Sequence, residues 1–260
     1  MANQAGNDHA TFRSRLLHQD LLVGTFVKTP SMMVAEVLAQ TDLDVVCIDA
    51  EHSPFDRRDI DQALFAYSAA NKPSLVRVPS SSPEQILNAL DCGATGVVVP
   101  HVDSVEKAGA CARASRYGDG GRGYAGSTRA AAYGANKITE NLAHNTDETT
   151  VIAQIEDLAA LDCIDDIAAV EGIDCLFIGM MDLTVALGQD SAKAPAVIAA
   201  AEKICAAAAA VNRRLGIFVP DVADIPFWQE RGVSLFLMAS DHAFIKQGAA
   251  RLVAAAKSNS

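Results

Sequence analysis

The sequence predicts an α/β protein with a (β/α)8 TIM barrel fold, and three observations lead to this prediction. Eight short apolar runs recur along the 260 residues, with stretches of helical spacing between them. Most of these runs are continuous rather than alternating, as is typical of parallel strands that are covered on both faces. A barrel of about 250 residues would use almost the whole chain. We therefore expect one barrel domain over residues 1–260, in which 1–20 form a polar, partly helical N-terminal extension.

The strands are predicted where β-branched and other apolar residues run together, and the helices where apolar residues recur every three or four positions. In chain order the predicted strands are 21–27, 44–49, 74–78, 95–99, 151–156, 174–178, 215–219 and 234–238. The clearest predicted helices are Met32–Ala39, 84–90, Val105–Ala114, 158–170 and 196–211. A doubly wound open sheet is the alternative, but no glycine-rich phosphate-binding fingerprint follows the first strand.

Two segments depart from simple alternation of strand and helix. Residues 117–150 form a long excursion that begins YGDGGRGYAGSTRAAAYG, and loops of this length inside a domain are usually functional or mobile. Residues 241–257 have the spacing of an amphipathic helix, with Phe244, Ile245, Leu252 and Val253 on its apolar side.

The composition excludes several classes of partner. With 21 basic and 32 acidic side chains, the formal charge of −11 repels nucleic-acid backbones and anionic lipid. Small anionic substrates remain compatible, because a bound cation or an arginine reverses the field locally. We find no run of the roughly 18 apolar residues needed for a membrane span and no signal peptide. The six cysteines form no CxxC pair, and a cytoplasmic protein is therefore expected.

Chemically active side chains follow several predicted strands. Chemistry in such barrels takes place at the carboxyl ends of the strands. Asp49 ends the second strand and is followed closely by His52, while Arg77 lies at the end of the third. Gln154 and Glu156 end the fifth strand, and Asp182 follows the sixth. We therefore expect these side chains to meet around one rim.

Glu156 and Asp182 are the candidate metal ligands. Two carboxylates at one rim repel each other and need a cation or protons between them, and hard divalent ions are commonly held in this way. The alternative is that each is an ordinary helix cap or surface acid.

The basic residues of the rim each have two interpretations. His52 is either a general base beside a carboxylate or a residue that caps the next helix. Arg77 either clamps a substrate carboxylate and stabilises an enolate, or forms a structural ion pair with Asp49 or Glu51, and both roles are compatible. His101, which follows the fourth strand, is interpreted as pocket lining.

Taken together, these motifs resemble the HpcH/HpaI aldolase family of metal-dependent pyruvate aldolases. The similarity runs from about residue 21 to 240, with the motifs in the order of the family. They are Gly24-Thr25-Phe26, IDAEHSP at 48–54, LVRVP at 75–79, LDCGATGVVVP at 90–100, RYGDGGRGYAG at 116–126, AQIED at 153–157, VEGIDCLFIG at 170–179 and Asp182-Leu183.

The resemblance implies a role for each matching residue. Glu156 and Asp182 would bind a divalent ion, Mg²⁺, Mn²⁺ or Co²⁺, and Gln154 and the backbone around Met181 would contact the 2-oxo acid. In the same comparison, Arg77 would stabilise the enolate, His52 would be the acid–base residue and Asp49 a further polar member of the site. Asp91 matches the acid that tunes the histidine.

The resemblance also implies an assembly. Asp91 precedes the fourth strand and so reaches His52 of its own chain only with difficulty, which suggests that it acts on a neighbouring subunit. This agrees with barrels that pair by exchanging the last helix and assemble into a homohexamer, a trimer of dimers. The acceptor pocket is expected from residues 117–134, the region after Phe218 and a neighbouring chain.

One position departs from the pattern of the family. The family usually has proline after the glycine of the sixth strand, whereas this chain has Met180. The change frees the backbone where the substrate carboxylate is expected and adds an adaptable side chain. Donor preference or affinity is therefore expected to differ.

The expected activity is reversible cleavage of a 4-hydroxy-2-oxo acid into pyruvate, or an analogue such as hydroxypyruvate, and an aldehyde. A Schiff-base route would need a lysine at a strand end, and only Lys28 lies close to one. Two alternatives remain open from the sequence. One is a lyase of CoA thioesters of the malyl-CoA or citryl type, and the other is a barrel that binds 2-oxo acids without turnover.

Overall fold

Eight parallel strands close into a barrel in the order of the sequence, and β8 pairs with β1 to complete it. The computed structural model describes residues 11–258. The strands are β1 Leu22–Val27, β2 Val45–Asp49, β3 Ser74–Arg77, β4 Gly96–Val99, β5 Thr150–Ile155, β6 Cys175–Ile178, β7 Arg214–Val219 and β8 Leu235–Ser240. The predicted TIM barrel is confirmed, and each predicted strand lies within two residues of an observed one.

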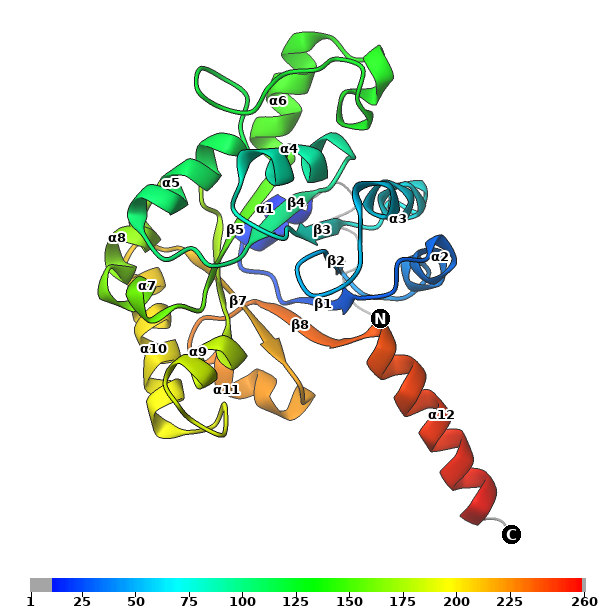
Figure 1. Ribbon diagram of the computed structural model, residues 1–260, viewed down its shortest axis with the longest axis vertical. Coiled ribbons are helices and arrows are strands. Elements are labelled where there is room, and N and C mark those ends of the chain that lie inside the picture. The colour runs from blue at the N-terminus through cyan, green and yellow to red at the C-terminus, as the bar shows by residue number, and fades with distance from the viewer. Residues whose placement is uncertain (1–10, 259–260) are drawn as a thin grey trace, which may run out of the picture.

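Apart from α1, which precedes the first strand, the helices follow the strands and lie outside the barrel (Figure 1). They are α1 Phe12–Leu17, α2 Met32–Ala39, α3 Arg57–Ala69, α4 Pro83–Asp91, α5 Val105–Ala114, α6 Ile138–Glu148, α7 Leu158–Asp162, α8 Ile164–Ala169, α9 Met180–Ala186, α10 Pro195–Ala210, α11 Ile225–Gln229 and α12 Asp241–Ser258. Two 3₁₀ turns, η1 Arg129–Gly134 and η2 Val222–Asp224, complete the regular structure of the described residues.

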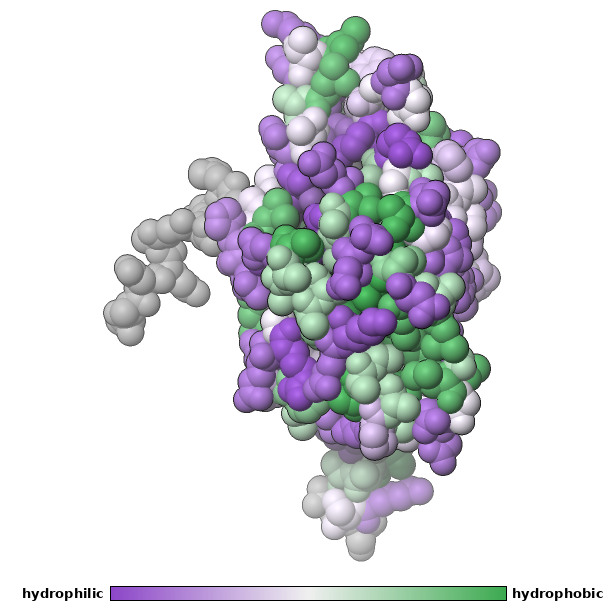
Figure 2. Space-filling view, turned by 90° about the vertical axis from the view of Figure 1, so that its left-hand side faces the viewer, coloured by the Kyte–Doolittle hydropathy of each residue, from purple (hydrophilic) through white to green (hydrophobic). Residues whose placement is uncertain are grey.

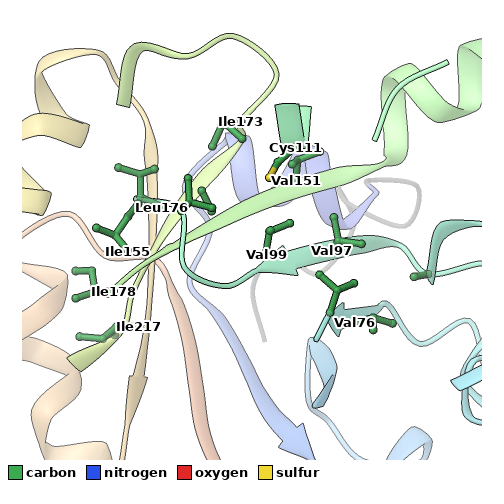
Figure 3. Packing of buried hydrophobic residues seen from close by; sticks show 14 of the residues in the cluster. Val76, Val97, Val99, Cys111, Val151, Ile155, Ile173, Leu176, Ile178 and Ile217 are labelled. Carbon is green, nitrogen blue, oxygen red and sulfur yellow. The ribbon is translucent and has the colours of Figure 1, made fainter. Parts of the chain in front are cut away.

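The strands are buried on both faces, and their side chains alternate between two layers. In β2, Val45 and Cys47 point into the barrel, whereas Val46 and Ile48 pack against the helices. Figure 3 shows part of the outer layer, in which side chains of β3 to β7 lie together with Cys111 of α5. This double burial explains why the strands read as continuous apolar runs in the sequence.

Helix α1 belongs to the core of the barrel. Phe12 and Leu16 are buried in the same cluster as the inward side chains of the strands. Arg13 of this helix pairs with Asp174 at 2.8 Å. The described part of the predicted extension is therefore packed structure, whereas residues 1–10 lie outside the described range.

Two segments differ from the expected pattern or refine it. The predicted helix 158–170 is two helices, because Cys163 between them has the non-helical angles φ −126° and ψ 26°. The excursion 117–150 contains η1 and α6 rather than loop alone. Asn145 of α6 holds the beginning of this excursion in place. Its side chain accepts a hydrogen bond from the backbone N–H of Tyr117 at 3.3 Å and donates one to the carbonyl of Ser115 at 3.2 Å.

The predicted C-terminal helix is present as α12 and projects away from the barrel (Figure 1). Its first residue, Asp241, is buried and accepts hydrogen bonds from the backbone of Lys28 and Thr29 at 2.8 and 2.9 Å. The face beside α5, α7 and α8 mixes hydrophilic and hydrophobic residues (Figure 2). No helix within residues 11–258 is long and apolar enough to cross a membrane.

Candidate active site

The alternation along each strand determines which polar side chains enter the barrel. In β2 the inward positions are Val45 and Cys47, so that Asp49 is the next inward residue. The same period places Arg77 above Leu75 in β3. An apolar strand with a polar residue at its last inward position therefore delivers that residue to the carboxyl rim.

A cavity of about 420 Å³ opens at this rim. Its lining combines the expected polar residues with aromatic and sulfur-containing side chains. The lining residues are Phe26, Lys28, His52, Arg77, Gln154, Phe177, Ile178, Gly179, Met180, Met181, Asp182, Phe218, Ala239, Ser240 and Ala243. The structure thus brings His52, Arg77, Gln154 and Asp182 to one cavity, with the elements that carry Asp49 and Glu156 beside it.

Asp49 organises the base of the cavity. Its fully buried carboxylate accepts from Nε of Arg77 at 3.0 Å, from Nζ of Lys28 at 2.5 Å and from the backbone N–H of His52 at 3.1 Å. Burial alone would raise the pKa of Asp49, but Arg77, Lys28 and the His52 N–H together lower it below its usual value. Asp49 therefore stays ionised and fixes three neighbours at once.

Arg77 is held from several sides. Its guanidinium lies 4.5 Å from the ring centroid of Phe26, and its Nε lies 3.4 Å from Oε2 of Glu51. Ion pairs with both Asp49 and Glu51 are thus present, as the structural interpretation of the sequence expects. The side chain nevertheless lines the cavity, so that these pairs orient the guanidinium without removing it from the cavity.

A second cluster combines Glu51, His101 and Glu156, whose ligand atoms lie within 4.8 Å of one another. The backbone N–H of His101 donates to Oε1 of Glu156 at 2.8 Å. Nδ1 of His101 lies 3.0 Å from Oδ2 of Asp157, which leaves Nε2 facing Glu51 at 3.7 Å. His101 has φ 54°, a left-handed conformation that a non-glycine residue keeps only where its surroundings hold it.

The carboxyls of this cluster are poorly solvated. Burial raises the pKa of Glu51, against the lowering effect of Arg77 and the histidines. Burial likewise raises the pKa of Glu156, and the charge of Asp182 adds to the shift, while Gln154 and His101 oppose it. A raised pKa means that the negative charge is short of compensation.

The donor set fits a divalent cation. Oε2 of Glu51 and Oε1 of Gln154 are buried and accept no hydrogen bond, although Oε2 of Glu51 lies within ion-pair distance of Arg77. Carboxylate and amide oxygens with one imidazole suit Mg²⁺, Mn²⁺ or Co²⁺. A cation near Glu156 would balance the charge that burial leaves uncompensated.

Asp182 has a different environment from Glu156. It lies in the first turn of α9 and is exposed, and no described hydrogen bond holds its carboxylate. Gly179, just before this helix, lies directly against Glu156, since a Cβ at Gly179 would come within 2.5 Å of the Glu156 Cβ. Asp182 therefore approaches Glu156 from the solvated side, and Met181 beside it is 61% exposed.

Asp91 is not brought to His52 within the chain. It is a buried residue at the end of α4 that pairs with Arg122, and it borders a different cavity with Arg57 and Arg129. Segment 117–134 is also turned away from the active-site cavity, because Tyr117 and Arg129 pack beside α6. Of the segments expected around the acceptor, the region of Phe218 borders the cavity in this chain.

Three residues of the site carry only a weak signal in the sequence. The sequence indicates Glu51 as a partner of Arg77, His101 as pocket lining and Lys28 as a Schiff-base candidate. Lys28 lies one position beyond the end of β1, and Glu51 lies two positions beyond the end of β2. There the alternation of the strand no longer indicates which way a side chain points. For His101, its position directly after the apolar run of β4 is the one feature of the sequence that indicates a place in the site.

The chain matches known proteins over most of its length. Residues 22–244 match the family model described as HpcH/HpaI aldolase/citrate lyase. A hydroxypyruvate/pyruvate aldolase of Paraburkholderia phytofirmans is 37% identical over 88% of this chain and 90% of the relative. A 5-keto-4-deoxy-D-glucarate aldolase of Salmonella paratyphi C is 32% identical over 88% of this chain and 90% of the relative.

A solved structure gives the same result. A protein of the HpcH/HpaI aldolase/citrate lyase family from Burkholderia cenocepacia superimposes with a TM-score of 0.90 at 32% identity. The match covers 96% of this chain and all of the other.

Proposed function

Because the chain belongs to the HpcH/HpaI aldolase/citrate lyase family, we propose that it is a divalent-metal-dependent aldolase. The reaction is reversible cleavage of a 4-hydroxy-2-oxo acid to pyruvate, or an analogue such as hydroxypyruvate, and an aldehyde. Its relatives named as hydroxypyruvate/pyruvate aldolases support this donor class.

Glu156 and Asp182 are the proposed metal ligands. Glu156 is buried, its pKa is raised by burial, and Asp182 adds negative charge beside it. A divalent ion bound there supplies the positive charge that polarises the 2-oxo group and stabilises the enolate. Glu156 also belongs to the group with Glu51 and His101, so that it is the ligand common to both arrangements.

Arg77 and Gln154 orient the 2-oxo acid in this proposal. The guanidinium of Arg77 donates to the oxygen on which negative charge develops, and the hydrogen bond to Asp49 fixes the orientation of this guanidinium before the substrate binds. Gln154 presents a buried amide to the same cavity, and its Oε1 has no partner in the chain. Prior orientation of these donors lowers the reorganisation needed during the reaction.

His52 is the proposed acid–base residue. It removes the proton of the 4-hydroxyl group, the oxygen electron pair forms the aldehyde carbonyl, and the C3–C4 bond breaks. The electron pair of that bond becomes the enolate, which a proton returned to C3 converts into the 2-oxo acid. The ring of His52 is 57% exposed, and its Nε2 lies 3.7 Å from Oε2 of Glu51, so that it is accessible to substrate and to a carboxylate.

The observation that carries the proposal is the meeting of Arg77, His52 and Asp182 at one cavity, next to the buried Glu156. Exchange of the pyruvate C3 protons in D₂O with Mn²⁺ tests it directly. We expect exchange in the wild type, loss with EDTA, and loss of about 100-fold or more in Arg77→Met, as for other groups that stabilise an oxyanion. Arg231→Met, which removes an arginine paired with Glu202 elsewhere, is the matched control.

Lys28 allows a separate test of the route. It is the lysine that lines the cavity, but its Nζ is engaged with Asp49. Borohydride treatment in the presence of pyruvate is expected to leave the mass of the protein unchanged. A pyruvate-sized adduct on Lys28, or exchange that persists in EDTA, would overturn the metal-dependent route.

We also propose that two chains pair by exchanging α12, and that such pairs assemble further into a hexamer. The helix projects from its own barrel, and Ile245 and Leu252 on it are 62% and 69% exposed (Figure 1). In such an assembly Asp91 of one chain would act on His52 of another. The unpaired cysteines, five of the six buried, support a reducing, cytoplasmic location.

A further inference from the structure

A second cavity adjoins the active-site cavity. It has a volume of about 370 Å³ and lies between α9, the end of β7 and α11. Met180, Met181 and Phe218 line both cavities, so that these three side chains form the boundary between them. We call this second cavity the side pocket. Its remaining lining residues are Ala192, Lys193, Ile198, Val219, Pro220, Asp224, Phe227 and Trp228.

The side pocket is apolar. Phe227 and Trp228 pack edge to face, with ring centroids 5.0 Å apart, and Ile198 contributes an aliphatic side chain. Its two charged residues, Lys193 and Asp224, pair with each other at 2.9 Å. Lys193 is 73% exposed, which places its charge at the solvent side of the pocket. The interior therefore offers no unpaired charge to an anionic group.

A chain of aromatic contacts leads from the reacting groups to the side pocket. Arg77 stacks on Phe26, and the ring of Phe26 lies 5.9 Å from that of Phe218. Phe218 in turn lines the side pocket. A substrate whose reacting carbons lie near Arg77 can thus extend past Phe218 along an apolar path.

We infer that the side pocket binds the apolar substituent of the acceptor aldehyde, an unbranched alkyl chain of about four to six carbons or a phenyl ring. The inference rests on the proposed aldolase function and names its acceptor class. Cavities of about 150 Å³ with apolar walls hold a benzene ring, and the side pocket is more than large enough. Met180 and Met181 can adapt to different substituents because their side chains are flexible.

Fluorescence measures occupancy without any turnover. Trp228 is the single tryptophan of the sequence and lines the side pocket. Titration with 1-hexanol or benzyl alcohol, which cannot react as acceptors, is expected to change its emission in a saturable manner. Glycerol is the polar control. Ala192→Phe, which narrows the pocket by one ring, should weaken the binding of these alcohols, whereas Ala192→Ser should keep it.

Kinetics then tests the link to catalysis. With pyruvate or hydroxypyruvate as donor, kcat/KM for straight-chain aldehydes should rise about fourfold per methylene group from acetaldehyde to hexanal. Ala192→Phe should reduce this rise for the longest aldehydes and leave the rate with acetaldehyde unchanged. Phe227→Ser, at a residue 38% exposed, gives an independent variant that reduces the apolar wall.

The outcomes separate the inference from the proposed function. A flat aldehyde series with normal acetaldehyde turnover would overturn the side-pocket inference and leave the aldolase intact. Absence of a saturable fluorescence change in the wild type would overturn it as well. Loss of all aldol turnover together with absent pyruvate proton exchange would instead refute the proposed function.

Discussion

At the scale of single residues, Asp49 holds three neighbouring groups of the site in place. One carboxylate fixes the guanidinium of Arg77, the amine of Lys28 and the backbone N–H of His52. A buried carboxylate with three donors is satisfied, whereas removal of its charge would leave Arg77 with Glu51 as its remaining acid partner. The position of the reacting groups therefore depends on an acid that itself faces no substrate.

Glu156 is the first residue to test as a metal ligand. We expect Glu156→Gln to weaken Mn²⁺ binding by at least about 100-fold, because loss even of an outer partner costs 10- to 100-fold. Isothermal titration calorimetry measures the affinity, and Glu84→Gln, at a fully exposed acid, is the control. Asp182→Asn and His101→Ala then show which group completes the site. Unchanged affinity in Glu156→Gln would refute its assignment.

The raised pKa values of Glu51 and Glu156 predict how stability depends on pH without metal. A glutamate whose pKa in the folded state lies above its unfolded value of about 4.3 stabilises the fold at pH values below that unfolded pKa. This stability is lost as pH rises through the folded pKa. His101, whose pKa its carboxylate neighbours raise despite burial, acts in the same direction above about pH 6.5.

Thermal unfolding in EDTA between pH 5 and 8 checks this dependence. The Tm of Glu51→Gln should exceed that of the wild type by a growing margin as pH rises, because glutamine stays neutral. Added Mn²⁺ should raise the wild-type Tm more at pH 8 than at pH 5, since the ion balances the negative charge of the ionised carboxylates. A margin that does not change with pH would contradict the prediction.

The sequence indicates the site only where the strand period still holds. Asp49, Arg77 and Gln154 occupy inward positions that follow from the apolar residues before them. Glu51 and His101 lie in loops, where direction depends on tertiary contacts such as the hydrogen bond from the His101 backbone to Glu156. Those partners are 55 residues apart in the chain, so that no local pattern can reveal their pairing.

At the scale of elements, the strands were easier to predict than the helices. Strands that are buried on both faces leave unbroken apolar runs, whereas α3 has exposed and charged residues on one side and is not among the clearest predicted helices. The break between α7 and α8 at Cys163 has no glycine or proline to mark it. Short helices such as α9 and α11 follow from packing at the strand ends rather than from local spacing.

Helix α1 gives a stability prediction for an element that the sequence had indicated only as a partly helical extension. Leu16 is fully buried beneath the barrel strands. We expect Leu16→Ala to lower the free energy of unfolding by about 2–5 kcal/mol, as for other buried leucines. Leu21→Ala, at a leucine 49% exposed, should change it by less than about 0.5 kcal/mol. Urea denaturation distinguishes these values, and equal effects would show that α1 does not stabilise the barrel.

At the scale of the whole molecule, the barrel positions its active site but leaves part of its apolar surface uncovered. Helix α12 buries only its first residue against the described chain. Asp91 is a buried acid paired with Arg122, away from His52. Both features have one explanation if α12 packs on a second barrel and brings Asp91 of that chain toward the first site. Assembly would then complete the catalytic machinery as well as the core.

Charge on the apolar side of α12 tests this explanation. We expect the wild type to be oligomeric and the double variant Ile245→Glu with Leu252→Glu to be monomeric, because burial of two charges without partners in an interface is strongly unfavourable. Light scattering coupled to size-exclusion chromatography measures the mass. Gln247→Glu with Ala254→Glu adds the same charge on the opposite side of the helix and should leave the oligomer intact.

The change to a monomer should also lower the catalytic rate. The monomeric variant keeps Glu156, Asp182 and Arg77 in one chain, so that Mn²⁺ affinity should stay within about threefold of the wild type, a change of about 0.7 kcal/mol. Its rate of pyruvate proton exchange should fall by about 100-fold or more, the range of general acid–base catalysis, because Asp91 of the partner is lost. A monomer with full exchange activity would show that one barrel suffices, and Asp91 would then have a structural role with Arg122.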